Sequence, residues 1–354
     1  MSLPIILSQR PPKEQISPDD DDKGHRGDQG RRYGETLARY NHLLETLPKG
    51  KGWMCEHLVQ YMNFWLTPTH ALKGTLLAQV HHHFHPHQAD DLFLASFPKS
   101  GTTWLRSLMF SIVNRNRFDI SNHPLLTNNP HDCFPFFEAY VCDQNPQSND
   151  PISSIAPNLY ATHIPFSLLP ASIKACKIVY VCRDPKDVFI SKWCFMSKVR
   201  SKKLPPLSLQ DAFELFCDGV SHYGPYWSHT LEYWRASLEH PDNVLFLKYE
   251  EMMRETSVHV KRLASFIGQP FTTREEIEGK IEEIVRLCSF ENLSKLDVNT
   301  DSKPRRDNMF DVKNKHFFRK GVVGDGEKML SAHMIDRLDR ITEQKLLGSG
   351  LSFQ

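Results

Sequence analysis

Residues 91–113, DLFLASFPKSGTTWLRSLMFSIV, carry the clearest signals of secondary structure in this sequence. Residues 91–97 form a short, nearly continuous apolar run, which is typical of a parallel β-strand that is covered on both faces. From Thr102 to Val113, apolar residues recur at helical spacing. Gly101, in the short loop between the two, relieves the backbone at the turn. The segment therefore predicts strand, tight loop and helix, with an anion site where the unpaired amides of the first helical turn face outward.

The same order of elements recurs twice along the chain. Residues 177–182 (KIVYVC) and 243–249 (NVLFLKY) are again short apolar runs, and helical spacing follows them over 184–196 and 250–267. Repeated units of this kind predict an α/β fold: a single domain with a central parallel β-sheet, helices on both faces and a P-loop-like phosphate-binding loop. In such sheets ligands bind outside the carboxyl ends of the strands, so the three loops are the candidate sites.

Composition sets the boundaries of this domain. The chain has 354 residues, 40% of them hydrophobic, which is enough for one large α/β domain with a sizeable core. Residues 1–34 are rich in Pro, Asp and Gly and show no helical or strand period, so we expect a disordered tail there. Residues 35–354 are predicted to form the domain.

Charge and cysteine usage argue against several classes of protein. Lys and Arg number 43 against 42 Asp and Glu, and a net charge of +1 lacks the broad positive field of a nucleic-acid-binding protein. The 8 cysteines are dispersed without a CxxC pair, and no secretory signal is evident, so we expect reduced thiols and a cytoplasmic location. No uninterrupted apolar stretch is long enough to span a membrane, so we expect no membrane partner.

The loop after the first predicted strand carries Lys99, Thr102 and Thr103 around Gly101. The lysine supplies a mobile positive charge and the threonine hydroxyls supply donors, which suits a phosphate group. The loop is not a Walker A motif, because the lysine precedes the glycine. From spacing alone, an ordinary capped loop explains the pattern equally well.

The loop after the second predicted strand carries Arg183, with Ser191 further along the following helix. The guanidinium at the carboxyl end of a strand can bind a phosphate through two parallel hydrogen bonds. Alternatively, Arg183 forms an ion pair with Asp184 or Asp187, and taken alone this structural role is the simpler interpretation.

A third candidate lies near the carboxyl end of the chain. Arg319 and Lys320 precede Gly321 and Gly324, and the glycines would let backbone amides approach an anion. A solvated turn is the alternative. The polar, basic stretch 299–315 just before it is either a solvated loop or a flap over an anion.

Together these segments carry a family resemblance. Residues 99–104 (KSGTTW) resemble the 5'-phosphosulfate loop of cytosolic sulfotransferases, and residues 180–191 resemble their 3'-phosphate motif. Residues 319–325 (RKGVVGD) resemble their carboxyl-terminal RKGxxGD signature. Weaker sequence similarity to this family extends over roughly residues 44–353, and these segments most resemble those of plant-type members.

The resemblance implies transfer of a sulfuryl group from 3'-phosphoadenosine 5'-phosphosulfate (PAPS) to a hydroxyl of a small, largely apolar acceptor. The residues that match the family's 5'-phosphate contacts are Lys99, Ser100, Gly101, Thr102 and Thr103. Those that match its 3'-phosphate contacts are Arg183, Ser191, Arg319, Lys320 and Gly321. Those that match its adenine pocket are Trp104, Tyr249, Cys288 and Phe290. His163 occupies the position of the catalytic base, and Lys99 would also neutralise charge on the leaving oxygen.

The chemistry of these residues suits that assignment. An acceptor hydroxyl is a weak nucleophile at neutral pH, and an imidazole with a pKa near 6.5 is a suitable proton acceptor. Lys99 and helix-terminus amides can take up the departing charge, so we expect no metal requirement. The acceptor could be a flavonoid, a steroid, a hydroxyjasmonate or a desulfoglucosinolate. We expect a monomer or a weak homodimer.

Three departures from the family pattern stand out. Ala161 replaces a lysine that often lies two residues before the histidine, Gly326 follows the last GD where Trp is common, and Cys288 replaces Thr. The phosphate loop leaves a nucleotide kinase as one alternative, against which the order of the loop residues argues. Ala161 and Gly326 leave a nucleotide-binding protein without catalysis as another, against which the presence of Lys99 and His163 argues. The histidine-rich stretch 81–87 is interrupted by Phe84 and Pro86, and we predict no metal site there.

Overall fold

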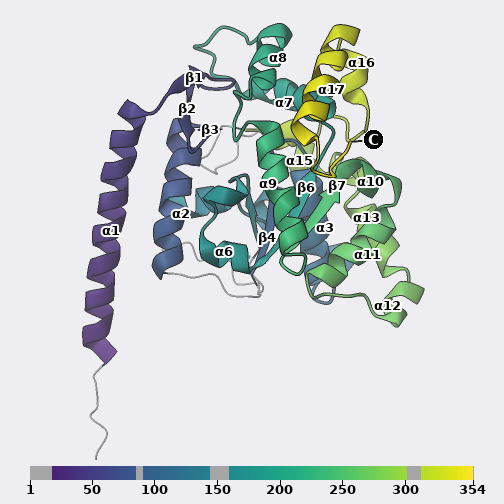
Figure 1. The fold of residues 1–354 in the computed structure, drawn as a ribbon. Helices are drawn as coiled ribbons and strands as arrows, with labels where there is room; N and C mark the ends of the chain where they lie inside the picture. Colours follow the sequence, from purple (N-terminus) through teal and green to yellow (C-terminus); the bar gives the residue numbers. More distant parts are fainter. Residues whose placement is uncertain (1–17, 85–90, 144–158, 301–311, 354) are drawn as a thin grey trace, which may run out of the picture.

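The computed structural model describes residues 18–84, 91–143, 159–300 and 312–353. Its centre is a parallel four-stranded sheet in the order β5-β4-β6-β7, which Figure 1 shows in the middle of the molecule. These strands are β4 (Leu92–Ser96), β5 (Leu159–Thr162), β6 (Lys177–Cys182) and β7 (Val244–Lys248). The register pairs Leu94 with Ala161 on one side and with Val179 on the other. The three strands expected from the sequence are confirmed, and β5 is an additional edge strand.

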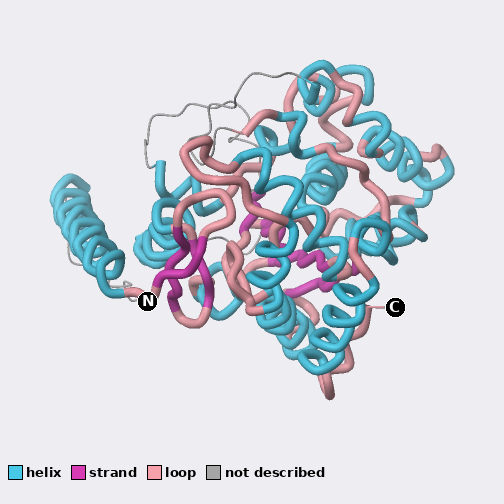
Figure 2. Tube along the Cα trace, turned by 90° about the horizontal axis from the view of Figure 1, so that it is seen from above, coloured by secondary structure: helices cyan, strands magenta, loops and turns pink. Residues whose placement is uncertain are grey.

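Alternate residues of the strands enter two separate hydrophobic cores. Phe93, Ile178 and Phe246 belong to one core, which also contains buried side chains of α7 (Pro185–Val199), α9 (Tyr226–Glu239) and α17 (Ala332–Leu346). Leu94 and Val179 belong to the other, which contains side chains of α3 (Thr102–Asn114), α11 (Thr256–Phe266) and α13 (Lys280–Leu287). Because both faces of each strand are buried, the strand sequences are nearly all apolar. Figure 2 shows the strands from above, inside a shell of helices, and the predicted α/β fold is confirmed.

The helices that follow the strands position the candidate loops. They are α3 (Thr102–Asn114) after β4, α7 (Pro185–Val199) after β6, and α10 (Tyr249–Arg254) with α11 (Thr256–Phe266) after β7. A single helix was predicted over 250–267, and this prediction is wrong at Glu255, whose φ of −131° and ψ of 58° are not helical. In α7, Pro185 is in the first turn, and the Asp184 side chain accepts a hydrogen bond from the amide of Lys186 at 2.8 Å.

A small antiparallel sheet lies beside the main one. It comprises β1 (Lys49–Lys51), β2 (His57–Tyr61) and β3 (Phe64–Leu66), in that order. Trp65 of β3 forms an isolated antiparallel bridge with Gly224, so this sheet holds a loop that enters the candidate site.

The remaining helical segments surround these two sheets. They are η1 (Pro68–Leu72), α2 (Lys73–Phe84), η2 (Ile120–Asn122), η3 (Pro124–Leu126), α4 (Pro130–Cys133), α5 (Phe137–Asp143), η4 (Phe166–Leu168), α6 (Ala171–Ala175), α8 (Leu209–Cys217), α9 (Tyr226–Glu239), α12 (Thr273–Ile277), α13 (Lys280–Leu287), α14 (Phe290–Leu293), α15 (Asp297–Thr300), η5 (Asn314–Phe317), α16 (Asp325–Met329) and α17 (Ala332–Leu346). None of the helices in the described ranges is long and apolar enough to cross a membrane.

The amino-terminal segment differs from the sequence prediction. No regular structure was expected before Gly34, but helix α1 (Pro18–Thr46) begins at Pro18 and runs along the outside of the molecule (Figure 1). Residues 1–17 lie outside the described part of the chain, so the prediction of a tail stays a prediction there.

Candidate active site

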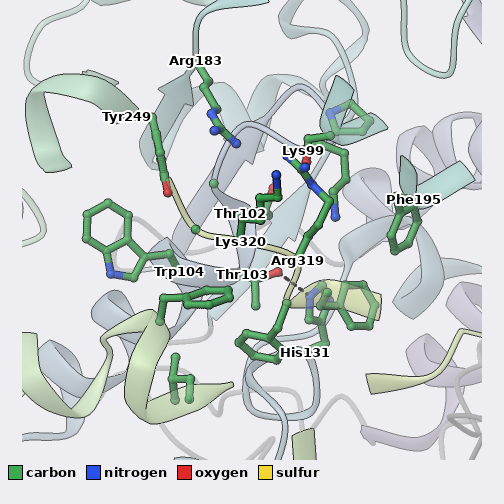
Figure 3. Close-up of a pocket in the computed structure, with 18 of the residues that line it drawn as sticks. Lys99, Thr102, Thr103, Trp104, His131, Arg183, Phe195, Tyr249, Arg319 and Lys320 are labelled. Atoms are coloured by element: carbon green, nitrogen blue, oxygen red, sulfur yellow. Dashed lines mark hydrogen bonds between the residues drawn. The ribbon is translucent and has the colours of Figure 1, made fainter. Parts of the chain in front are cut away.

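A cavity of about 340 Å³ opens at the carboxyl ends of the parallel strands. All but one of the residues predicted for the site line it (Figure 3). They are Lys99, Gly101, Thr102, Thr103, Trp104, His163, Arg183, Ser191, Tyr249, Cys288, Phe290, Arg319, Lys320 and Gly321. The exception is Ser100, which is fully buried and whose Oγ has no hydrogen-bond partner among the described residues.

The β4–α3 loop exposes backbone amides to this cavity. Lys99 has a φ of +76° and Gly101 a φ of +113°, both in the left-handed region. A Cβ at Gly101 would lie 2.8 Å from the ring of Tyr249, so only glycine fits there. No side chain caps the start of α3, which leaves its first amides available to an anion.

The pKa of the Lys99 side chain is shifted from its ordinary value. Burial, followed by the positive charges of Arg319, Arg183 and Lys198, lowers the pKa of its ammonium to about 7. Its Nζ lies 4.1 Å from the centre of the Phe195 ring. A bound anion would offset the repulsion between these cations, so the arrangement favours a ligand with more than one negative charge.

Arg183 lies at the cavity wall and also forms an ion pair. Its Nη2 is 2.8 Å from Oδ2 of Asp187, as the structural interpretation of this residue required, and it donates to the carbonyl of Val322 at 2.5 Å. The guanidinium carbon lies 4.5 Å from the centre of the Tyr249 ring. In Figure 3 the guanidinium points toward the region that contains Lys99. The ion pair therefore orients Arg183 without removing it from the cavity.

Asp187 also fixes the carboxyl-terminal loop. Its Oδ2 accepts the amide of Gly324 at 2.9 Å and its Oδ1 accepts the amide of Gly326 at 2.6 Å. A Cβ at Gly326 would lie 2.5 Å from the carbonyl carbon of Lys186. The glycine after the last GD is thus a requirement of close backbone packing between α16 and α7.

Arg319 and Lys320 share one carboxylate. Both donate to Asp325, Lys320 at 2.7 Å. Burial alone would raise the pKa of the Asp325 carboxyl, but the hydrogen bonds from Lys320 and Arg319 outweigh it and hold this pKa below its ordinary value. A Cβ at Gly321 would lie 2.6 Å from the Phe290 ring, so this loop packs directly on an aromatic wall of the cavity.

His163 is held in one tautomer. Its Nδ1 lies 2.6 Å from the carbonyl oxygen of Ser96, and because a carbonyl only accepts, Nδ1 carries the proton and Nε2 keeps its lone pair. The backbone amide of His163 donates to Oε1 of Glu138 at 2.8 Å, and its carbonyl lies 2.9 Å from Nε2 of His229. Burial first, and the positive charge of Arg106, hold the pKa of His163 well below its ordinary value. The imidazole is therefore neutral and able to accept a proton at neutral pH.

The predicted adenine pocket consists of packed aromatic rings and a buried thiol. Trp104 and Tyr249 meet edge to face, with ring centres 5.5 Å apart. Cys288 is fully buried, its Sγ lies 3.3 Å from Oγ of Ser111, and burial raises the pKa of its thiol to about 12. The sulfur therefore acts as an apolar wall rather than as a nucleophile.

His131 lines the same cavity. Its Nδ1 lies 2.8 Å from Nη1 of Arg106, and because a guanidinium only donates, Nε2 carries the proton. Nε2 donates to Oγ1 of Thr103 at 3.0 Å, the dashed line in Figure 3. With both ring nitrogens in hydrogen bonds, His131 is not available as a base.

Other lining residues were not found from the sequence. They lie outside the phosphate-loop and carboxyl-terminal motifs: Met54, Phe195, Met196, His222, Tyr223 and Phe317. Only their shared place in the fold reveals them.

No group of metal-binding side chains occurs among the residues that the structure describes. The side chains of the histidine-rich stretch 81–87 lie outside this part, as do residues 301–311 of the basic stretch 299–315, for which a solvated loop and a flap were the two alternatives. That the protein needs no metal stays a prediction.

Comparison with known proteins assigns the family. A sequence model of the Sulfotransferase domain matches residues 89–350. Cytosolic sulfotransferase 17 of Arabidopsis thaliana is 43% identical over 322 residues, which cover 90% of this chain and 91% of that protein. Flavonol 4'-sulfotransferase of Flaveria chlorifolia is 42% identical over 328 residues, 89% of this chain and 98% of that protein.

Solved structures agree with this result. The crystal structure of an Arabidopsis thaliana putative steroid sulphotransferase, 37% identical, superimposes with a TM-score of 0.66 and covers 88% of this chain and 94% of that one. Retinol dehydratase in complex with androsterone and the inactive cofactor PAP, 21% identical, gives a TM-score of 0.66 over 89% of this chain and 96% of that one, and shows the shared fold. The chain therefore belongs to the cytosolic sulfotransferase family, is similar to its plant members at about 40% identity, and is a sulfotransferase.

Proposed function

We propose that this enzyme transfers the sulfuryl group of PAPS to a hydroxyl of a small, largely apolar acceptor, with His163 as the general base. The products are a sulfate ester and adenosine 3',5'-bisphosphate. The observation that carries the proposal is the tautomer of His163: Nδ1 donates to the Ser96 carbonyl, and Nε2 is left as a proton acceptor in the cavity that Lys99 lines.

The cationic loops support the choice of donor. Lys99 and the uncapped amides of α3 suit the 5'-phosphosulfate end, and Arg183, Arg319 and Lys320 suit a second, separate phosphate. Retinol dehydratase, which shares this fold, was crystallised with PAP. Two anion sites in one cavity match a nucleotide that is phosphorylated at two positions.

The reaction then proceeds through the chain's own groups. Nε2 of His163 takes the proton of the acceptor hydroxyl as its oxygen forms a bond to sulfur. The bond between sulfur and the phosphate oxygen breaks, and Lys99 and the helix-terminus amides stabilise the negative charge that develops on that oxygen. The Ser96 carbonyl stabilises the imidazolium, because Nδ1–H of His163 keeps its hydrogen bond throughout.

Apolar residues support the choice of acceptor. Met54, Phe136, Phe195 and Met196 line the cavity, and such surfaces bind hydrocarbon frames. Flavonoids, steroids, hydroxyjasmonates and desulfoglucosinolates all fit this description. The names of two relatives, a flavonol 4'-sulfotransferase and a putative steroid sulphotransferase, place flavonols and steroids first in a panel. We also infer a cytoplasmic location from the relatives named cytosolic, no nucleic-acid partner, and a monomer or weak homodimer.

The test is a direct transfer assay. The purified protein is incubated with sulfur-labelled PAPS and each acceptor in turn, and sulfated products and adenosine 3',5'-bisphosphate are quantified by mass spectrometry. We expect both products in equal amounts with at least one hydroxylated acceptor. Nucleotide binding without product from any acceptor would favour the non-catalytic alternative, and phosphoryl transfer from ATP would favour the kinase.

A further inference from the structure

His222 is a buried histidine that the reaction described above does not use. Only 3% of the residue is exposed, it lines the same cavity as His163, and neither of its ring nitrogens has a hydrogen-bond partner among the described residues. Buried polar groups are nearly always paired, because an unpaired one loses its hydration without compensation. An unpaired imidazole at a cavity wall therefore points to a ligand.

Its neighbour His229 shows what a structural histidine looks like in this region. His229 is fully buried in α9, its Nδ1 lies 3.0 Å from the hydroxyl of Tyr180, and its Nε2 lies 2.9 Å from the carbonyl of His163. Both ring nitrogens are thus paired within the protein. His222 and His229 are both buried, so burial does not explain why only His229 has hydrogen-bond partners.

Two hydrogen bonds hold the backbone around His222. Nζ of the fully buried Lys192 donates to the His222 carbonyl at 2.8 Å, and the amide of Tyr223 donates to the carbonyl of Trp65 at 2.7 Å. Tyr223 has a φ of +61°, which a non-glycine residue adopts only where its surroundings enforce it. The imidazole is therefore presented by a fixed loop, as a binding group should be.

The charge state of His222 indicates the kind of group it would bind. Burial first, and then the positive charge of Lys192, hold the pKa of His222 well below its ordinary value, so the ring is neutral. A neutral imidazole offers one N–H donor and one acceptor nitrogen. A hydroxyl, which both donates and accepts, complements it, and Met54 and Met196, which line the same cavity, favour an otherwise apolar molecule.

We propose that His222 binds a second hydroxyl of the acceptor, distinct from the one that receives the sulfuryl group, and so selects acceptors with two hydroxyls on an apolar frame. This rests on the proposed function, in which His163 takes the proton of the reacting hydroxyl. We do not assign His222 to the reacting oxygen, because His163 already accepts its proton and an N–H donated to that oxygen would lower its nucleophilicity.

The first test compares the stabilities of two matched variants without any acceptor. An unpaired buried polar group adds no stability, so His222→Phe should melt within about 2 °C of the wild type or above it. His229→Phe breaks two hydrogen bonds and should melt several degrees lower. If the melting temperature of His222→Phe fell as far as that of His229→Phe, the proposal would be overturned, because His222 would then have a structural role.

The second test compares acceptors in pairs, such as 17β-estradiol with its 17-deoxy analogue, and kaempferol with flavonols that lack one hydroxyl. In each pair of acceptors, one hydroxyl should matter to the wild type. Its absence from the acceptor should lower kcat/KM of the wild type by about tenfold to a hundredfold, mainly through a higher KM. His222→Phe should treat both members of that pair nearly alike, and His222→Gln, which keeps a donor and an acceptor, should retain part of the preference. An unchanged preference in His222→Phe would overturn the proposal, as would an equal fall in kcat for every acceptor.

Binding of the same pairs to the protein with adenosine 3',5'-bisphosphate, measured by calorimetry, separates the two proposals. If no acceptor is sulfated but the binding preference exists and depends on His222, the proposed function fails and the role of His222 stands. If sulfation occurs and the preference does not depend on His222, the function stands and the inference fails.

Discussion

Two groups of residues in the cavity wall are held in different ways. The group that we propose binds the nucleotide, called here the nucleotide end, comprises Arg183, which is paired with Asp187, and Arg319 and Lys320, which are paired with Asp325. The group that we propose binds the acceptor, called here the acceptor end, includes His222, which has no partner among the described residues, and His163, whose pKa lies well below its ordinary value.

This difference is what the proposed function would require. Carboxylates would hold the cations of the nucleotide end in place before a phosphate arrives, which limits the cost of gathering like charges. The imidazoles of the acceptor end are neutral, so we expect this end to distinguish molecules by the position of a hydroxyl rather than by charge. Each prediction below changes one end and asks whether the other responds.

The largest effect is expected from His163→Ala. Turnover should fall by about a hundredfold or more, because the acceptor proton loses its base, while affinity for adenosine 3',5'-bisphosphate stays nearly constant. Lys99→Ala should impair both quantities, and the exposed His333→Ala should impair neither. Steady-state kinetics and calorimetry measure the two quantities. Weak nucleotide binding by His163→Ala with normal turnover at saturation would mean that the base is misassigned.

A smaller effect is expected from Arg319→Ala at the nucleotide end. Affinity for adenosine 3',5'-bisphosphate should fall by about 1.5–3 kcal/mol, the range for a charge-assisted hydrogen bond. Affinity for adenosine 5'-phosphosulfate, which lacks the 3'-phosphate, should change far less. Equal losses for both ligands would show that Arg319 does not bind the 3'-phosphate, and the division between two anion sites would then be wrong.

Nucleotide affinity and turnover should respond to pH in opposite directions. The ammonium of Lys99, with a pKa of about 7, is lost as pH rises, so nucleotide affinity should fall about tenfold between pH 6 and pH 8. Lys99→Arg stays charged and should show a weaker dependence. Because burial lowers the pKa of His163, turnover should decline on the acid side only below the usual imidazole range. Nucleotide titrations and kcat profiles across this range would contradict the assignment if Lys99→Arg matched the wild type.

A modest effect is expected from Gly326→Ala. The added methyl group would meet the backbone of Lys186 and Asp187, so we expect a loss of about 1–3 kcal/mol in the free energy of unfolding and a few-fold weaker nucleotide binding. Gly34→Ala is a suitable control, because nothing lies within 4 Å of its added Cβ. Denaturant unfolding and calorimetry provide the measurements, and unchanged stability in Gly326→Ala would show that α16 is free to shift.

The smallest effect is expected from removal of divalent metal. Excess chelator should leave turnover essentially intact, because Lys99 and the amides of α3 already supply positive charge at the leaving oxygen. Loss of activity with chelator, restored by magnesium, would mean that the nucleotide end is incomplete without a metal.

Much of the fold and of the cavity wall could be predicted from the sequence, because the relevant signals are local. A buried parallel strand, a glycine turn and an amphipathic helix follow one another within residues 91–113, and each reveals itself by periodicity or by backbone freedom. Local motifs also identified Lys99, Arg183 and Arg319, and all three residues line one cavity. Strand β5, with four residues at the edge of the sheet, and the break at Glu255 escaped prediction because neither carries a strong local pattern.

The three strand–loop–helix units and the residues of their loops could be recognised in the sequence, since these patterns depend on neighbours along the chain. Which groups are paired became evident from the packing of the folded chain. Asp187 meets Gly326, and Lys192 meets His222, through the packing of α7 against α16 and against the loop that follows α8. Hydrogen-bond partners far apart in sequence leave no periodic trace, because their meeting depends on how whole elements pack. For that reason the paired His131 and the unpaired His222 could be told apart only in the folded chain.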